Sequence, residues 1–433
     1  MLVEFKIENF RSFQSEQTFS MVASKDDAHP HNLIECDKLS LVKTAAIYGP
    51  NASGKSTLIN ALKAMQRFVT TSATQMNIGD QIDCAVPFRL DNESESKPSR
   101  FEVTLLLDGT TYYYGFSATA ERVCEETLDV RKAGGRISHW FDRQFDSATG
   151  QTTWKINGPL KHDAELLRTK TRDNGLLLSR GAEFNLLSLT PLFLWFRQKC
   201  RILDLSETTD QLGQTTAEML ETNAEYRPRI LELMRDADFG ICDIQVQKES
   251  VPKLPRNAGG TSFHEPFRRA CSEFRVTSYH ESHECDKRVQ FRFEEDESNG
   301  TQRFFALVGP ILKSLAEGTL LIIDELDCSM HPLLTRKVIE LFQSREANPR
   351  GAQMIFTTHD SSMMDSSLFR RDQIWLIEKH RHGDADLYSL YDFAEPSRPR
   401  KWEALEKNYF VGRYGGVPMF GPSLEYLEYQ DVP

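Results

Sequence analysis

The segment Gly49-Pro50-Asn51-Ala52-Ser53-Gly54-Lys55-Ser56 decides the fold class of this chain of 433 residues. It fits the pattern G-x-x-x-x-G-K-[ST] at every defined position. The mainly apolar run 43–48 before it predicts a short strand, and residues 57–65 after it carry apolar side chains at helical spacing. Strand, glycine-containing loop and helix form the context in which this pattern binds phosphate groups, so we expect an α/β protein with a phosphate loop.

The residue types in this loop indicate the chemistry that it performs. Glycines let backbone N–H groups surround phosphates, and the N-terminus of the following helix favours an anion. Lys55 is expected to reach the β- and γ-phosphates, and the Ser56 hydroxyl is expected to bind Mg²⁺. The sequence therefore predicts ATP and Mg²⁺ as ligands. The predicted nucleotide-binding residues of the loop are Gly49, Pro50, Asn51, Ala52, Ser53, Gly54, Lys55, Ser56 and Thr57.

Two other predicted strands end in residues that suit phosphate chemistry. The apolar run 320–323 is typical of a buried parallel strand and ends at Asp324 and Glu325. We expect Asp324 to hold the Mg²⁺ shell and Glu325 to polarise the attacking water. His359 follows the predicted strand 353–358, where an imidazole can contact the γ-phosphate. Without further evidence, such residues are usually solvated strand ends. Because the same chain carries a phosphate loop, the catalytic interpretation is favoured, and we assign catalysis to Lys55, Glu325 and His359.

The stretch Glu297-Ser298-Asn299-Gly300-Thr301-Gln302 leads into a predicted helix from 301 to about 316. On propensity alone this is a capped helix start, with Ser298 or Thr301 as the N-cap. The order of motifs along the chain favours a functional role for this segment in addition to helix capping. A phosphate loop, a Ser-x-Gly helix start, an Asp-Glu strand end, Asp327 and a strand-end histidine follow one another along the chain.

In this order of motifs the chain resembles ABC-type ATPase heads, in their chromosome-maintenance-like and RecF-like branch. It resembles more closely the AAA-type ATPases of prokaryotic abortive-infection and PARIS-type antiphage loci. This resemblance covers both ends of the chain and leaves residues 121–290 only loosely matched. The segments that carry it are 7–13, 49–56, 297–301, 324–332, 357–359 and 412–418.

The resemblance implies that two protomers sandwich two ATP molecules. Ser298 and Gly300 of one protomer would touch the γ-phosphate held by the other, and Asp327 would link the two sites. His359 would sense the γ-phosphate, and Arg11 would lie near the nucleotide. Larger assemblies of such dimers are left open.

Two features depart from the family pattern. The signature sequence Glu-Ser-Asn-Gly-Thr-Gln lacks the usual Leu-Ser-Gly-Gly-Gln, which weakens the expected contact between protomers. The glutamine that usually senses Mg²⁺ has no clear counterpart. The segment 181–185 is the best candidate for that position, and it offers Glu183 or Asn185.

We expect the fold of an ABC-type ATPase head, a mixed sheet with the phosphate loop plus an antiparallel arm, interrupted by an inserted subdomain. Predicted strands at 101–107 and 111–117, joined at Asp108-Gly109, form the hairpin of that arm. The strand 2–7 is expected at a sheet edge. The expected parts are an N-terminal lobe 1–120, a largely helical insertion 121–290, a C-terminal lobe 291–395 and a tail 396–433.

Composition excludes several classes of protein. Hydrophobic residues make up 39%, which suffices for an ordinary core, and 52 basic against 63 acidic residues give a net charge of −11. No global basic field would therefore attract nucleic acid or a membrane surface. The eight cysteines form no C-x-x-C pair, which argues against a disulfide framework or a zinc ribbon. No apolar run reaches the roughly 18 residues that a membrane span needs. Residues 280–285 fit a solvated face better than a metal site. We expect a cytoplasmic protein.

The leading functional hypothesis is a Mg²⁺-dependent ATPase that hydrolyses ATP to ADP and phosphate and works as a switch. By resemblance, it would sense phage infection, through a phage-encoded trigger, and control a separately encoded toxic effector, typically a nuclease. The alternative is a DNA-repair or recombination ATPase of the RecF-like class that binds DNA directly, which the acidic balance disfavours mildly. A nuclease activity of the chain itself is disfavoured because too few residues follow His359 for the C-terminal domain of such enzymes. A transporter ATPase is disfavoured by the insertion and the unusual signature.

Overall fold

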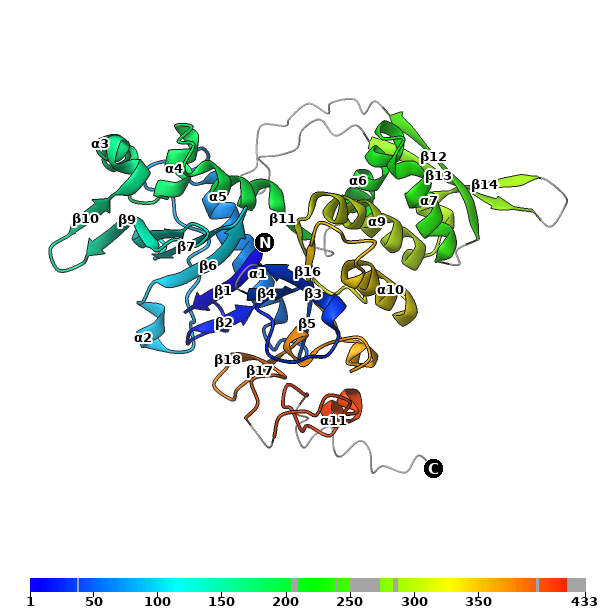
Figure 1. Cartoon of the computed structure of the whole chain (residues 1–433). Helices are drawn as coiled ribbons and strands as arrows, with labels where there is room; N and C mark the ends of the chain where they lie inside the picture. Colours follow the sequence, from blue (N-terminus) through cyan, green and yellow to red (C-terminus); the bar gives the residue numbers. More distant parts are fainter. Residues whose placement is uncertain are drawn as a thin grey trace, which may run out of the picture. The chain divides into compact units, whose positions relative to one another are not determined.

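The computed structural model describes residues 1–36, 39–203, 209–237, 240–249, 273–282, 287–394 and 397–418 (Figure 1). The chain divides into two compact units. The first comprises residues 1–203, 317–327 and 336–433, and the second comprises residues 204–316 and 328–335. Of the segment 280–285 considered above as a metal site, residues 283–285 lie outside the described residues.

The first unit contains a six-stranded sheet in the order β11-β15-β16-β5-β17-β18. Its strands are β11 (Cys200–Leu203), β15 (Leu320–Ile323), β16 (Gln353–Thr357), β5 (Thr44–Tyr48), β17 (Ile374–Lys379) and β18 (Ala385–Ser389). The first five strands are parallel, and only β18 runs antiparallel to its neighbour. Every residue of β5, β15 and β16 is buried, as expected for the apolar runs of a parallel sheet. The parallel strands therefore end at one common edge.

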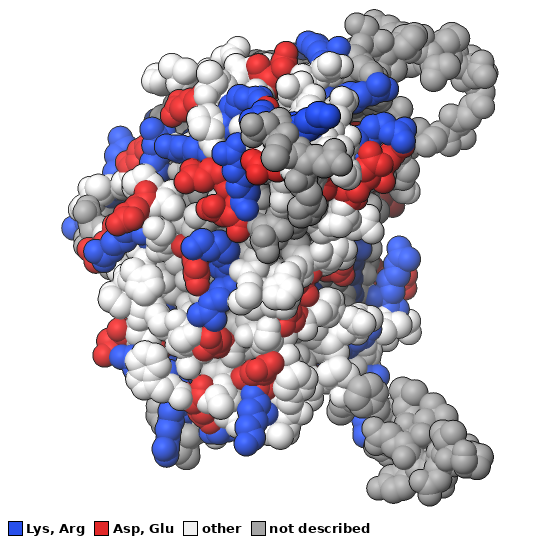
Figure 2. All heavy atoms as spheres, turned by 90° about the vertical axis from the view of Figure 1, so that its right-hand side faces the viewer, with Lys and Arg blue, Asp and Glu red and all other residues white. Residues whose placement is uncertain are grey.

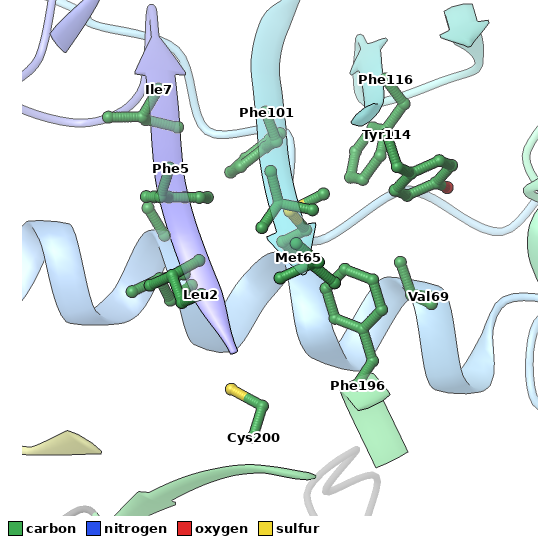
Figure 3. Packing of buried hydrophobic residues seen from close by; sticks show 14 of the residues in the cluster. Leu2, Phe5, Ile7, Met65, Val69, Phe101, Tyr114, Phe116, Phe196 and Cys200 are labelled. Carbon is green, nitrogen blue, oxygen red and sulfur yellow. The ribbon is translucent and has the colours of Figure 1, made fainter. Parts of the chain in front are cut away.

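Helix α1 (Lys55–Thr71) begins inside the phosphate loop and packs its apolar face into the main core. Met65 and Val69 lie four residues apart on that face and are fully buried. Figure 3 shows both residues on the side of the helix that faces β1 (Leu2–Glu8) and β6 (Ser99–Leu107), with Met65 next to Phe101 of β6. The helix that carries the phosphate loop is thus fixed between the two sheets of this unit.

The second sheet of the first unit has seven antiparallel strands in the order β10-β9-β8-β7-β6-β1-β2. Its remaining strands are β2 (Gln17–Ser20), β7 (Thr110–Ala118), β8 (Val123–Arg131), β9 (Ile137–Asp146) and β10 (Gln151–Ile156). Strands β6 and β7 form the predicted hairpin, and Asp108 and Gly109 at its turn have positive φ, as a type I′ turn requires. The expectation that β1 lies at an edge is wrong, because β2 pairs with its outer side.

The prediction of a largely helical stretch over 121–290 is wrong for its first part. Residues 123–156 form three strands that extend the antiparallel sheet. Leu128 and Val130 alternate with more exposed neighbours, and this period of two is the pattern of a half-buried strand. Both side chains join the core together with Phe141. The helical elements that follow are η2 (Gly158–Asp163), α3 (Ala164–Lys170), α4 (Leu177–Glu183), α5 (Thr190–Leu194) and the π-helix η3 (Trp195–Lys199).

The second unit combines helices with a three-stranded antiparallel sheet. Its elements are α6 (Thr209–Thr222), α7 (Tyr226–Asp236), β12 (Ile241–Glu249), β13 (Glu273–Glu281), β14 (Arg288–Arg292), α8 (Phe293–Asp296) and most of α9 (Asn299–Glu317). Pro310 lies inside α9, as predicted. The hydroxyl of Thr216 donates to the carbonyl of Phe305 (2.7 Å) and accepts from the N–H of Gly309 (3.0 Å). It thereby satisfies backbone groups beside the proline, where the helical hydrogen-bond ladder is interrupted.

Short elements complete the described chain. They are η1 (Pro30–Asn32), β3 (Leu33–Cys36), β4 (Leu39–Val42), α2 (Asn92–Glu95), α10 (Pro332–Gln343), η4 (Ser361–Met363), η5 (Arg371–Gln373) and α11 (Leu405–Phe410). Within the described ranges, none of the helices has the length and apolarity to cross a membrane. The predicted α/β class, with a mixed sheet carrying the phosphate loop and an antiparallel arm, is confirmed.

Candidate nucleotide-binding site

A cavity of about 340 Å³ opens in the first unit where the parallel strands end. It joins residues from the phosphate loop to residues that follow β15, β16 and β1. Its lining consists of Arg11, Ser12, Asn51, Ala52, Gly54, Lys55, Ser56, Thr57, Glu325, His359 and Lys379. The structure thus brings most of the predicted site residues into one pocket.

The backbone of the phosphate loop depends on its glycines. Gly49 and Gly54 have φ of 151° and 121°, which side chains with a Cβ rarely adopt. A Cβ on Gly49 would lie 2.5 Å from the carbonyl oxygen of Ile377, and one on Gly54 would lie 2.8 Å from Oγ of Ser12. Between them, the Ser53 side chain is buried in the loop. The loop is therefore folded tightly enough to present its N–H groups to a phosphate chain.

Lys55 is buried with its charge directed at backbone oxygens. Its side chain is 6% exposed, and Nζ donates to the carbonyl oxygens of Gly49 (2.7 Å) and Pro50 (3.0 Å). Burial lowers the pKa of Lys55 to about 8, and the nearby carboxylates of Asp324 and Glu325 partly oppose that shift. A buried ammonium that is hydrogen-bonded to neutral carbonyl groups gains strongly from an added anion, so Lys55 suits a phosphate contact.

One threonine, Thr357, holds the two acidic residues that follow β15. The hydroxyl of Thr357 on β16 donates to Oδ1 of Asp324 (2.6 Å) and accepts from the N–H of Glu325 (2.7 Å). Glu325 has φ of 56°, and its carboxylate is 52% exposed. Oε1 of Glu325 lies 3.8 Å from Nε2 of His359, beyond hydrogen-bond distance. Both side chains line the cavity, where one water molecule can hydrogen-bond to the two atoms at once.

Asp327 holds the loop that carries His359. Its Oδ2 accepts from the backbone N–H of His359 (3.2 Å), whereas its Oδ1 is buried and has no hydrogen-bond partner in the described structure. A buried carboxylate oxygen without a partner is costly and suits a donor from outside the chain. The expected role of Asp327 between two sites remains a prediction.

The donor set at the loop fits Mg²⁺. The hydroxyl of Ser56 is exposed in the cavity. Asp324 follows β15, which lies two strands from β5 in the sheet, and it does not itself line the cavity. Hydroxyl and carboxylate oxygens are ligands that Mg²⁺ accepts, together with water and phosphate oxygens. Among the described residues no group of three or more His, Cys, Asp or Glu side chains could hold a metal by itself. Such a site would take its remaining ligands from the nucleotide.

The signature residues belong to the second unit. Oγ of Ser298 accepts from the N–H of Thr301 (3.2 Å) and so caps α9, as the propensity of the sequence indicated. A Cβ on Gly300 would lie 2.8 Å from the carbonyl oxygen of Ser329, so this position requires glycine. The residues that line the cavity all belong to the first unit, and the contact of Ser298 and Gly300 with a partner's nucleotide remains a prediction.

Sequence reasoning missed two residues of the cavity, Ser12 and Lys379. Oγ of Ser12 donates to Oγ1 of Thr57 (3.2 Å), which links the turn after β1 to α1. Lys379 is the last residue of β17, whose apolar run 374–377 the sequence predicted. Since the carboxyl ends of parallel strands meet at one edge, the residues after this run could have been named with Glu325 and His359. Glu183 ends α4, where it pairs with Arg180, and it does not line the cavity.

Comparisons with solved structures found weak likenesses. The SMC head domain from Thermotoga maritima is 12% identical, with a TM-score of 0.40, and the match covers 90% of this chain and 98% of that chain. The recombination mediator protein RecF, in a structure titled RecF-ATP in the RecFOR pathway, is 14% identical, with a TM-score of 0.30, and the match covers 89% and 97% of the two chains. A search of curated proteins found no match.

A protein-family match covers residues 45–365, which include the phosphate loop, Glu325 and His359. This range spans well over half of the chain. The match therefore assigns an AAA domain to the part of the chain that forms the cavity beside the phosphate loop. The chain therefore belongs to the family described as "AAA domain, putative AbiEii toxin, Type IV TA system".

Proposed function

We propose that this protein is a Mg²⁺-dependent ATPase that hydrolyses ATP to ADP and phosphate and uses this cycle as a switch. The observation that carries the proposal is the cavity in which Lys55 of the phosphate loop lies together with Glu325 and His359. A cation for the phosphates, a carboxylate for the water and an imidazole for the terminal phosphate are the groups that phosphoryl transfer needs.

The side chains divide the work of hydrolysis. The backbone N–H groups of the loop and the ammonium of Lys55 bind the phosphates and stabilise their growing negative charge. The carboxylate of Glu325 orients a water molecule and accepts its proton, and His359 holds the terminal phosphate in line. When bound by Ser56 and Asp324, Mg²⁺ supplies neutralising charge to the β- and γ-phosphates. Arg11 lies at the same cavity and adds a second cation.

We propose that the switch acts in prokaryotic antiphage defence, in the cytoplasm. The family description, which names an AbiEii toxin and a type IV toxin–antitoxin system, supports a role beside a toxic effector. In this proposal a phage-encoded trigger changes the nucleotide state, and the change controls a separately encoded effector such as a nuclease. Two copies of the chain would sandwich two ATP molecules, with Ser298, Gly300 and Asp327 between them. Assemblies larger than this dimer remain compatible with the proposal.

The charge distribution supports a protein partner over DNA on the face shown in Figure 2. Among the described residues of that face, lysine and arginine side chains alternate with aspartate and glutamate and form no continuous basic patch. DNA backbones are bound by clustered cations whose contacts release counterions. The alternative of a RecF-like ATPase that binds DNA directly is therefore left as an outcome of the experiment.

The test is the mass of the purified protein in solution, with and without ATP and Mg²⁺, for the wild type and Glu325→Gln. We expect Glu325→Gln to bind ATP, to hydrolyse it at least about 100-fold more slowly and to accumulate as a dimer. Lys55→Ala serves as the control that cannot bind nucleotide. Normal turnover by Glu325→Gln would overturn the assignment of Glu325, and assembly or hydrolysis that requires added DNA would favour the RecF-like alternative.

A further inference from the structure

Lys379 lies in the cavity with no assigned role, and the order of the strands shows which part of a nucleotide it faces. Strand β5, which leads into the phosphate loop, lies between β16 and β17 (Figure 1). Glu325 follows β15 and His359 follows β16, on one side of β5. Lys379 ends β17, on the other side. With about 4.8 Å between neighbouring strands, β15 and β17 lie roughly 14 Å apart, which a nucleoside triphosphate can span.

This order fixes the direction of the nucleotide, given the proposed ATPase function on which the inference rests. The bond that breaks lies between the β- and γ-phosphates, so the γ-phosphate must lie near Glu325 and His359. The β-phosphate lies over the phosphate loop at the end of β5. The α-phosphate and the nucleoside must then extend toward β17.

Arg11 belongs to the same end of the cavity as Lys379. Its neighbour Ser12 accepts at its carbonyl oxygen from the N–H of Ala385 (2.9 Å), the first residue of β18. Since β18 pairs with the outer side of β17, the turn that carries Arg11 lies beside β17. Two cations, Arg11 and Lys379, therefore line the part of the cavity that is farthest along the sheet from Glu325.

The alternation of β17 directs Lys379 toward the cavity. The preceding residue, Glu378, has its side chain on the opposite face, where its carboxylate accepts from the hydroxyl of Tyr388 (3.0 Å). Lys379 is exposed, and its side chain forms no hydrogen bond or ion pair with another described residue. Among the residues that line the cavity, Glu325 is the only carboxylate, and it lies at the far end. Within the described part of the chain, the ammonium of Lys379 is thus not paired with a carboxylate.

We propose that Lys379 binds the α-phosphate of the nucleotide. A compact ammonium with three donors and no acceptor suits an anionic oxygen of a phosphate. Because ATP and ADP both carry the α-phosphate, Lys379 contributes equally to the binding of both. His359, at the γ-phosphate end, contributes to the binding of ATP only.

The experiment measures the dissociation constants of ATP and ADP by isothermal titration calorimetry, in the Glu325→Gln background so that ATP persists. We expect Lys379→Ala to weaken the binding of both nucleotides by roughly tenfold and to leave their ratio unchanged. Lys379→Arg, which keeps the charge, should restore most of the affinity. His359→Ala should weaken ATP alone. Lys132→Ala removes an exposed lysine from the turn between β8 and β9 and should change neither constant.

Two results would overturn the inference. Unchanged affinities in Lys379→Ala would show that Lys379 does not touch the nucleotide, and a loss confined to ATP would place the γ-phosphate at β17. Failure of the proposed function has a different signature, because Lys55→Ala would then bind ATP as well as the unsubstituted protein does.

Discussion

Lys55 shows how one residue can be unfavourable for the free protein and necessary for its ligand. Burial removes water from its ammonium and lowers its pKa to about 8, which is a cost to the folded state that is full below that pH and fades as the pH rises toward the ordinary lysine value. The carbonyl groups of Gly49 and Pro50 recover part of that cost through hydrogen bonds. Phosphate oxygens offer full negative charge in the same place and recover the rest.

Lys55→Ala should therefore abolish ATP binding without weakening the fold. We expect the affinity to fall by at least about 100-fold, because a buried charge-assisted contact is lost. The melting temperature should stay the same or rise, since the substitution removes a desolvated charge. Calorimetric titration and thermal unfolding of the same sample separate the two effects. A variant that still binds ATP would remove the phosphate loop from the site.

The pKa of Lys55 also predicts how affinity depends on pH. The free protein holds Lys55 protonated below about pH 8 and neutral above it, whereas bound phosphates favour the protonated form. ATP affinity should therefore be constant below about pH 8, fall as the pH rises above it, and be accompanied by proton uptake there. Titrations in buffers of different ionisation enthalpy measure that uptake. Lys55→Arg, which stays charged throughout this range, should lose the dependence.

At the scale of elements, helix α4 (Leu177–Glu183) begins without a capping residue of its own. Its N-cap position is Leu176, whose side chain accepts no hydrogen bond. The carboxylate of Glu126, on β8, accepts instead from the N–H groups of Leu177 (2.7 Å) and Leu178 (3.0 Å). The guanidinium of Arg143, on β9, lies 3.9 Å from the same carboxylate, and both side chains are buried. Strands of the antiparallel sheet thus supply the cap that the helix lacks.

Glu126→Ala should destabilise the first unit strongly. It leaves two helix N–H groups without acceptors and removes the buried counter-charge of Arg143, which then faces the exposed carboxylate of Asp173 (4.0 Å), at a cost of about 3–5 kcal/mol. Urea unfolding followed by circular dichroism measures the change in the free energy of unfolding. Glu121→Ala, at an exposed position just before β8, is the matched control and should change it by less than about 0.5 kcal/mol. Equal stabilities of the two variants would contradict the capping role of Glu126.

At the scale of the whole molecule, the proposed ATP sandwich predicts sites that need two copies. If Ser298 completes the site of a partner, Lys55→Ala and Ser298→Arg should each be inactive alone. Mixing them should restore ATPase activity, because one composite site of the heterodimer then has an intact phosphate loop and an intact signature. Steady-state hydrolysis across mixing ratios measures the recovery. No recovery from two folded variants would exclude a signature that acts between protomers.

The sequence alone identified the phosphate loop, two strands of the parallel sheet and one hairpin of the antiparallel sheet. The phosphate loop could be recognised because its glycines and Lys55 act through local backbone geometry, which needs no knowledge of distant residues. The strands β5 and β15 and the residues after them could be predicted in the same way. A continuous apolar run indicates a buried parallel strand even when the neighbouring strands are unknown. The hairpin of β6 and β7 followed from its Asp-Gly turn.

The tertiary structure decided what depends on pairing between distant segments. Residues 123–156 pair as strands with the hairpin, although the sequence favoured a helical insertion, because strand pairing is set by partners far along the chain. The order of the parallel strands, which places Lys379 and Glu325 at opposite ends of one cavity, is likewise absent from any local pattern. Local chemistry identifies the phosphate loop, and non-local packing determines which side chains surround it.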